Sequence, residues 1–115
     1  MSKCIKVSTD NKVSIVDIDF DVFDEIFDAV GGFFTIVRTP ELFKCLGYNT
    51  VMLVDDDGYA KHLDPNLTGT YFYKPGVIVG DIILCLEVSC ELEGFDDPEV
   101  VKRALLNMFL NLEEE

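Results

Sequence analysis

The residues most able to do chemistry in this sequence are four closely spaced carboxylates: Asp21, Asp24, Glu25 and Asp28. Their i, i+3, i+4, i+7 spacing places all four along one face of a helix, with neighbouring Cβ atoms about 5–6 Å apart. No Lys or Arg interrupts this acidic row, although i,i+4 ion pairs commonly support an exposed helix. Two interpretations follow: a solvated face that keeps the chain in solution, or a contact surface for a Lys- and Arg-lined groove.

Further carboxylates extend this candidate surface on either side. Asp17 and Asp19 precede the acidic row, and a second acidic cluster lies between residues 87 and 99. Carboxylates at such spacing resemble the phosphates of a nucleic acid, and their field steers association with basic channels. The sequence leaves open whether the two clusters are adjacent. The candidate partner-binding residues are Asp17, Asp19, Asp21, Asp24, Glu25, Asp28, Glu91, Glu93, Asp96 and Asp97.

Four cysteines and one histidine are candidates for metal binding. The cysteines lack C-x-x-C spacing, and Cys85 and Cys90 are separated by an odd number of residues, so a regular strand would point them to opposite faces. We therefore expect free thiols and no cofactor, with a structural zinc ion as the alternative. The ligands of that zinc would come from Cys4, Cys45, Cys85, Cys90 and His62.

Catalysis and small-ligand binding are the rival functions. No G-x-S-x-G, H-E-x-x-H or P-loop pattern occurs, so we expect a protein that is not an enzyme. A thiol-dependent enzyme would use Cys45 with His62. A nucleotide-binding sponge would need phosphate-binding groups, for which the candidates are Arg38, Lys61, Lys74 and the Gly31-Gly32 turn.

The composition restricts the partners that suit these residues. The chain has 115 residues, 49% of them hydrophobic, which predicts one domain over residues 1–115 with its own core. Its formal net charge of -13 disfavours direct contact with nucleic acid or an anionic membrane and favours a basic protein partner. No stretch approaches the roughly 20 apolar residues of a membrane span, and no export signal is recognisable, so we expect a cytoplasmic protein.

Hydrophobic periodicity predicts the elements that position these residues. Alternating residues 4–8 and 13–18 predict a hairpin, and apolar residues at helical spacing before Gly31-Gly32 predict a helix over residues 21–30. Asp97 before Pro98 predicts a second helix that runs to about residue 111. Between the helices we expect strands at 33–38, 50–55 and 59–63, a helical turn at 41–47, a loop around 64–69, and extended chain at 70–73 and 77–91.

This order, β-β-α-β-β-β-β-α, predicts an α+β fold. Hairpin-length connections favour a mostly antiparallel sheet of five to six strands, and the two helices would pack on it.

Four segments carry a family resemblance that spans roughly residues 5–85. They are Val30-Gly31-Gly32-Phe33-Phe34, Val51-Met52-Leu53-Val54-Asp55-Asp56-Asp57-Gly58, Leu63-Asp64-Pro65-Asn66 and Ile78-Val79-Gly80-Asp81-Ile82-Ile83-Leu84. In these the chain resembles a domain family of unknown function found mainly in phages, plasmids and Firmicute genomes. The family has no settled activity, so the resemblance carries over no catalytic residue.

The resemblance implies a biological setting, namely a protein encoded by a mobile genetic element. Small acidic proteins of mobile elements often look like anti-restriction or anti-CRISPR proteins, which block basic host nucleases. The leading hypothesis is therefore a non-enzymatic inhibitor in the cytoplasm of a host bacterial cell. It would bind a basic host-defence nuclease such as a CRISPR effector and impede nucleic-acid loading, with the acidic row as its main contact.

Overall fold

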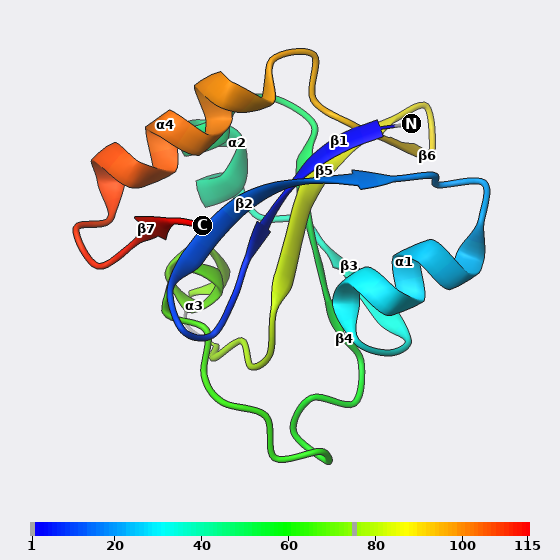
Figure 1. The fold of residues 1–115 in the computed structure, drawn as a ribbon, viewed down its shortest axis with the longest axis vertical. Coiled ribbons are helices and arrows are strands. Elements are labelled where there is room, and N and C mark those ends of the chain that lie inside the picture. The colour runs from blue at the N-terminus through cyan, green and yellow to red at the C-terminus, as the bar shows by residue number, and fades with distance from the viewer. Residues whose placement is uncertain (1, 75) are drawn as a thin grey trace.

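The computed structural model describes residues 2–74 and 76–115, whose arrangement Figure 1 shows. The strands are β1 (Ser2–Val7), β2 (Lys12–Ile18), β3 (Phe34–Val37), β4 (Thr50–Asp55), β5 (Ile82–Val88), β6 (Glu91–Glu93) and β7 (Glu113–Glu114). The helices are α1 (Phe23–Val30), α2 (Pro40–Leu46), α3 (Leu67–Tyr73) and α4 (Pro98–Met108). The predicted α+β fold class, with a mostly antiparallel sheet, is confirmed.

The strands form one sheet in the order β3-β4-β5-β1-β2-β7, and β6 pairs with β5 beyond that path. Every pair is antiparallel except the short pairing of β2 with β7. The β1–β2 hairpin turns at Asn11, whose φ of 65° lies in the left-handed region that asparagine tolerates. β1 therefore lies in the interior of the sheet, between β2 and β5 (Figure 1).

Hydrophobic layers form on both faces of this sheet. On one face, Leu42 of α2, Phe72 of α3 and Leu105 of α4 belong to one buried cluster. On the other face, Ile26 and Val30 of α1 belong to a second. All of β4 and the first four residues of β5 are buried. Strands that are covered on both faces consist of continuous apolar residues. This explains why apolar and polar residues do not alternate along β4 and the start of β5.

The middle of the chain differs from the sequence prediction. Residues 2–74 and 76–115 form four helices and seven strands, where the sequence predicts two helices and five to six strands. Residues 40–46 form the complete helix α2, and α3 replaces the loop and extended chain expected up to residue 73. Residues 59–63, predicted as the hairpin partner of β4, form turns, because β4 is already paired with β3 and β5.

A buried asparagine explains why α3 forms where the local pattern indicates extended chain. Asn66 is 1% exposed, and its Oδ1 accepts a hydrogen bond from the Gly69 N–H at 3.0 Å, which caps the helix. Its Nδ2 donates to the carbonyl oxygens of Val7 and Gly80, each at 3.0 Å. One amide thus fixes the start of α3 and ties it to β1 and to the loop before β5.

The predicted helix signals at the two ends of the chain are confirmed. α1 ends at Gly31, whose φ is 97° and whose N–H donates to the Phe27 carbonyl at 2.8 Å. α4 starts after Asp97, whose carboxylate accepts from the Val100 N–H at 3.4 Å. Both helices are shorter than predicted, since α1 begins at Phe23 and α4 ends at Met108. Within residues 2–74 and 76–115 no helix is long and apolar enough to cross a membrane.

Asn66→Ala is expected to lower the free energy of unfolding by about 2–4 kcal/mol, because it removes the helix cap and two buried hydrogen bonds to backbone carbonyls. Urea unfolding followed by circular dichroism measures the change. The control is Asn107→Ala on the exposed side of α4, which should stay within about 0.5 kcal/mol of the parent chain. A small effect in both variants would contradict the anchoring role of Asn66.

Candidate protein-binding surface

Four phenylalanine rings gather where α1 meets the start of β3 and form the aromatic cluster: Phe23, Phe27, Phe33 and Phe34. The ring centroid of Phe23 lies 6.0 Å from that of Phe27 and 6.1 Å from that of Phe33. Phe27 and Phe33 meet edge to face at 5.2 Å. Phe23 and Phe33 are nevertheless 50% and 61% exposed. A contiguous group of exposed aromatic rings is typical of a protein-contact surface.

The apolar residues whose spacing predicts the first helix do not all pack on the sheet. Only Ile26 and Val30 of these residues are buried, while Val22 is 42% exposed. Ile26 and Val30 lie one turn apart on the side of α1 that faces the sheet. Phe23 and Phe27 are also one turn apart, but they lie against the rings of the cluster that follow the helix.

The turn after α1 holds the cluster in place. The Lys61 ammonium lies 2.7 Å from the Asp55 carboxylate and donates to the Gly31 carbonyl at 3.1 Å. The Asp55 side chain is 1% exposed, so this ion pair joins the end of α1 to a buried carboxylate at the end of β4. A Cβ at Gly32 would displace the Lys61 ammonium and would lie 3.1 Å from the Asp55 carboxylate, so the second glycine leaves room for this ion pair.

The structure corrects the prediction that all four carboxylates of the acidic row lie on one helix, because α1 begins at Phe23 and Asp21 precedes it. The row also divides by the contacts that its members make. Asp21, Asp24 and Asp28 are exposed and form no ion pair with the part of the chain that the structure describes. The carboxylate of Glu25 instead accepts a hydrogen bond from the Asp19 N–H at 3.0 Å. Asp24 and Glu25 lie in the first turn of α1, where the helix dipole favours negative charge.

The carboxylates that precede the row also have local roles. Asp19 accepts from the Asp21 N–H at 3.0 Å and so shapes the approach to α1. Asp17 pairs with Lys3 at 2.8 Å, and both side chains are largely exposed. Part of the candidate surface therefore stabilises the turn before the helix or is already neutralised. The carboxylates left to meet a partner are mainly Asp21, Asp24 and Asp28.

The second acidic cluster is adjacent to the first at one point. A hollow of about 420 Å³ is lined by Asp19 and Asp21 on one side and by Glu91 on the other, so β6 lies beside the turn before α1. Glu93 and Asp96 are exposed farther along the chain. Asp97 has a different role, since its carboxylate caps α4.

The predicted zinc ligands do not come together. Cys4 and Cys85 are buried in the cluster under α1, whereas Cys45 packs against the cluster on the opposite face of the sheet. Cys90 is exposed, and His62 lies in an exposed turn with a φ of 59°. Among residues 2–74 and 76–115, no group of three or more His, Cys, Asp or Glu side chains is arranged to hold a metal ion.

The two buried thiols are poor nucleophiles in this environment. Burial, with a smaller contribution from the nearby Asp17 carboxylate, raises the pKa of Cys4 to about 12. Burial likewise raises the pKa of the Cys85 thiol, and the neighbouring Cys4 adds to this effect. Cys45 packs against the cluster under α2, α3 and α4, while His62 lies in an exposed turn, and no hydrogen bond joins them among the described side chains.

The cations proposed for phosphate binding are engaged within the protein. Arg38 donates two hydrogen bonds of 2.6 Å to Glu87, and this contact lowers the pKa of that carboxyl. Lys61 is held by Asp55, and the Lys74 ammonium lies 4.2 Å from the centroid of the Tyr71 ring. The Gly31-Gly32 turn directs a carbonyl to Lys61. The groups required by a nucleotide-binding sponge are therefore occupied.

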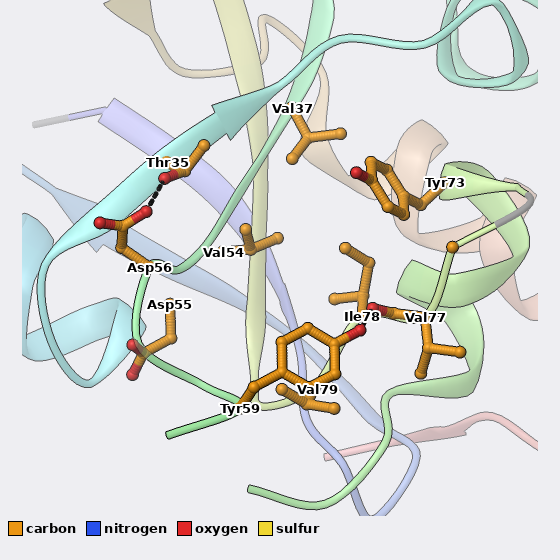
Figure 2. Close-up of a pocket in the computed structure, with 11 residues that line it drawn as sticks. Thr35, Val37, Val54, Asp55, Asp56, Tyr59, Tyr73, Val77, Ile78 and Val79 are labelled. Atoms are coloured by element: carbon orange, nitrogen blue, oxygen red, sulfur yellow. Dashed lines mark hydrogen bonds between the residues drawn. The ribbon is translucent and has the colours of Figure 1, made fainter. Parts of the chain in front are cut away.

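A second hollow, of about 260 Å³, lies on the other side of β3 and was not foreseen from sequence. Figure 2 shows apolar side chains between two tyrosines, and we call this site the tyrosine hollow. Tyr59 donates to the Val77 carbonyl, and Asp56 accepts from the Thr35 hydroxyl. Its described lining residues are Thr35, Val37, Val54, Asp55, Asp56, Tyr59, Tyr73, Gly76, Val77, Ile78 and Val79. Residues so far apart in the chain give no local sequence signal.

Comparisons with protein-family models, curated proteins and solved structures find no match to this chain. The resemblance to a mobile-element family therefore stays a prediction. The function is inferred from the surface itself, in which an exposed aromatic cluster lies beside carboxylates on α1.

Phe33→Ser is expected to change the free energy of unfolding by no more than about 1 kcal/mol, because most of this ring is already in contact with solvent. The contrasting variant is Phe72→Ala, whose ring is fully buried and whose loss should cost about 3–5 kcal/mol. Urea unfolding of both variants measures the difference. A loss in Phe33→Ser as large as that in Phe72→Ala would show that Phe33 is a core residue.

The thiols are expected to differ in reactivity at pH 8. An aromatic disulfide reagent should modify the exposed Cys90 rapidly, whereas Cys4 and Cys85 should react only as the chain unfolds, because their pKa values are raised. Cys90→Ser should remove a rapid phase. Rapid labelling of Cys4, located by mass spectrometry of tryptic peptides, would contradict this assignment.

The same pKa shifts predict the direction of a pH effect on stability. The unfolded chain loses its thiol protons near the ordinary pKa of 9.0, while folded Cys4 keeps its proton until about pH 12. Stability from this group is therefore complete below pH 9 and falls as the pH rises towards 12. Urea unfolding between pH 8 and pH 11 measures the slope, which should be shallower in Cys4→Ala.

Proposed function

We propose that this chain is a non-catalytic binding protein that docks on a basic partner protein through the α1 face. The observation that carries the proposal is the aromatic cluster, which lies beside the acidic row. The side chains of Phe23 and Phe33 in this cluster are 50% and 61% exposed. Apolar rings at the centre of an interface supply most of its affinity when they enter a pocket on the partner. Carboxylates at the rim supply orientation and speed of association.

The charges indicate the chemistry of the partner. Asp24 and Asp28 lie on α1 with no Lys or Arg paired to them in the described chain, and the net charge of -13 acts in the same direction at longer range. Lys- and Arg-rich surfaces are therefore attracted, whereas nucleic acids and anionic membranes are repelled. The partner would present an apolar pocket with basic residues around it.

The partner class we propose is a host-defence nuclease, such as a CRISPR effector, inside a bacterial cell. Nucleases of this kind hold nucleic acid in a basic channel, and a row of carboxylates would compete for that channel with the phosphates. Two arguments support this choice: the acidic surface and the resemblance to a mobile-element family. Occupying the channel would impede nucleic-acid loading without any chemical step by this chain.

The double variant Asp24→Lys/Asp28→Lys is expected to weaken binding at least about tenfold, because it turns attraction at the rim into repulsion. The measurement is capture of purified basic nucleases by the immobilised chain at low and at high salt, followed by titration of the nuclease that binds. Binding by the parent chain should fall as salt rises, since exposed charges are screened.

The matched control is Glu99→Lys/Glu114→Lys. It changes the net charge equally, but it lies at α4 and β7, away from α1 (Figure 1), where both carboxylates contact Lys102. This control should retain most of the affinity. Equal effects in the two double variants would mean that net charge alone drives association, and unchanged binding in both would refute the proposal.

A further inference from the structure

β3 is the terminal strand of the sheet, and its outer edge is open. The Asp56 N–H donates to the Phe33 carbonyl at 2.8 Å, and these residues face each other one step beyond the pair Phe34↔Asp55. Opposed residues in antiparallel strands alternate between hydrogen-bonded and non-hydrogen-bonded pairs. The N–H and C=O groups of Phe34 and Ile36 therefore point away from β4. Among the described residues, β3 pairs only with β4, so nothing else occupies these groups.

The sequence of β3 does nothing to protect this edge. Its residues are Phe-Thr-Ile-Val, which all favour strands and include no charge, Pro or Gly. Natural sheets usually blunt an open edge with a Lys, a Pro or a bulge, because unpaired backbone groups attract another strand. Near the opposite end of the sheet, β2 is partly covered by the short strand β7, with a Lys12–Glu113 ion pair beside that pairing.

Two receptive surfaces flank the β3 edge, one on each face of the sheet. The Phe34 ring belongs to the aromatic cluster, 6.5 Å from the ring of Phe23. Thr35 and Val37 point to the other face and line the tyrosine hollow (Figure 2). Side chains of an added strand alternate between the two faces. They would therefore contact the aromatic cluster and the tyrosine hollow in turn.

We propose that the β3 edge binds an extended segment of the basic partner by strand addition. The apolar residues of that segment would pack on the aromatic cluster. Its alternate Lys or Arg residues would face the tyrosine hollow, which contains the Asp56 carboxylate and has no basic residue in its described lining. A second copy of this chain is the less suitable occupant, because each copy carries a net charge of -13. The inference rests on the proposed function, and it specifies how the basic partner binds.

The test uses the acetylated and amidated peptide Lys-Val-Lys-Val-Lys-Val-Lys with the ¹⁵N-labelled full chain. Peptide addition should shift the amide signals of Phe34 and Ile36 and slow their hydrogen exchange at least about tenfold, because both N–H groups become hydrogen-bonded. Absence of these changes at millimolar peptide would overturn the inference. Formation of β3-paired dimers without peptide, seen by sedimentation velocity, would overturn it in favour of a second copy.

Two N-methylated peptides of equal charge are the matched controls. Antiparallel addition places the valine N–H groups against β3, so methylation of the valine amides should abolish binding while methylation of the lysine amides preserves it. The reverse result would also support strand addition, with the segment parallel to β3. Equal binding of both peptides would show that charge alone holds them and would refute the inference.

Ile36→Pro tests the same edge from the side of the protein. It removes an N–H that the β3–β4 pairing does not use, and proline is tolerated on edge strands. The variant should fold and lose peptide binding, and retained binding would refute strand addition. A different experiment tests the proposed function. That proposal is refuted if capture of the nuclease is unaffected by the Asp24→Lys/Asp28→Lys change. If the Ile36→Pro variant does not fold, the comparison of the two N-methylated peptides tests strand addition instead.

Discussion

β4 and the first half of β5 have no face that meets water, and the arrangement of the helices follows from this constraint. Every residue of β4 and the first four of β5 are buried, so both faces must be covered. Three helices cover one face, whereas on the other α1 is the one helix among the described residues, assisted by Phe20 before it. An eight-residue helix is only about 12 Å long. The aromatic cluster is exposed because this cover ends beside β3.

The exposed rings are held by the protein itself, which matters for any contact they make. The end of α1 is tied to the end of β4 through Lys61, which contacts both Gly31 and the buried Asp55. Phe33 follows this tie directly and meets Phe27 edge to face. Rings already fixed in position lose little conformational entropy on binding. A small acidic protein can in this way present a rigid apolar centre with a charged rim.

The sequence predicts structure well where one residue decides the backbone locally. Gly31 after α1 and Asp97 before α4 each satisfy or permit a specific backbone geometry, and their neighbours in the sequence are enough to predict both. α3 was missed because its cap, Asn66, gains its other partners from Val7 and Gly80. The sequence predicts the acidic row as one helix face, but α1 begins at Phe23 and leaves Asp21 outside it. The hydrogen bond from Asp19 to Glu25 and the Lys3–Asp17 pair depend on the fold. The exposure of Phe23 and Phe33 depends on how far α1 extends over the sheet, which periodicity does not specify.

The placement of β1 inside the sheet has a consequence for the time course of folding. Ile5 pairs with Leu84, so the central contact joins residues 79 positions apart (84 − 5). The entropy of closing such a large loop must be lost before the contact stabilises the chain. Folds dominated by distant pairings of this kind generally form in milliseconds to seconds rather than microseconds. Until β1 and β5 meet, the apolar residues of β4 stay accessible to other chains, and the high negative charge keeps those chains apart during that interval.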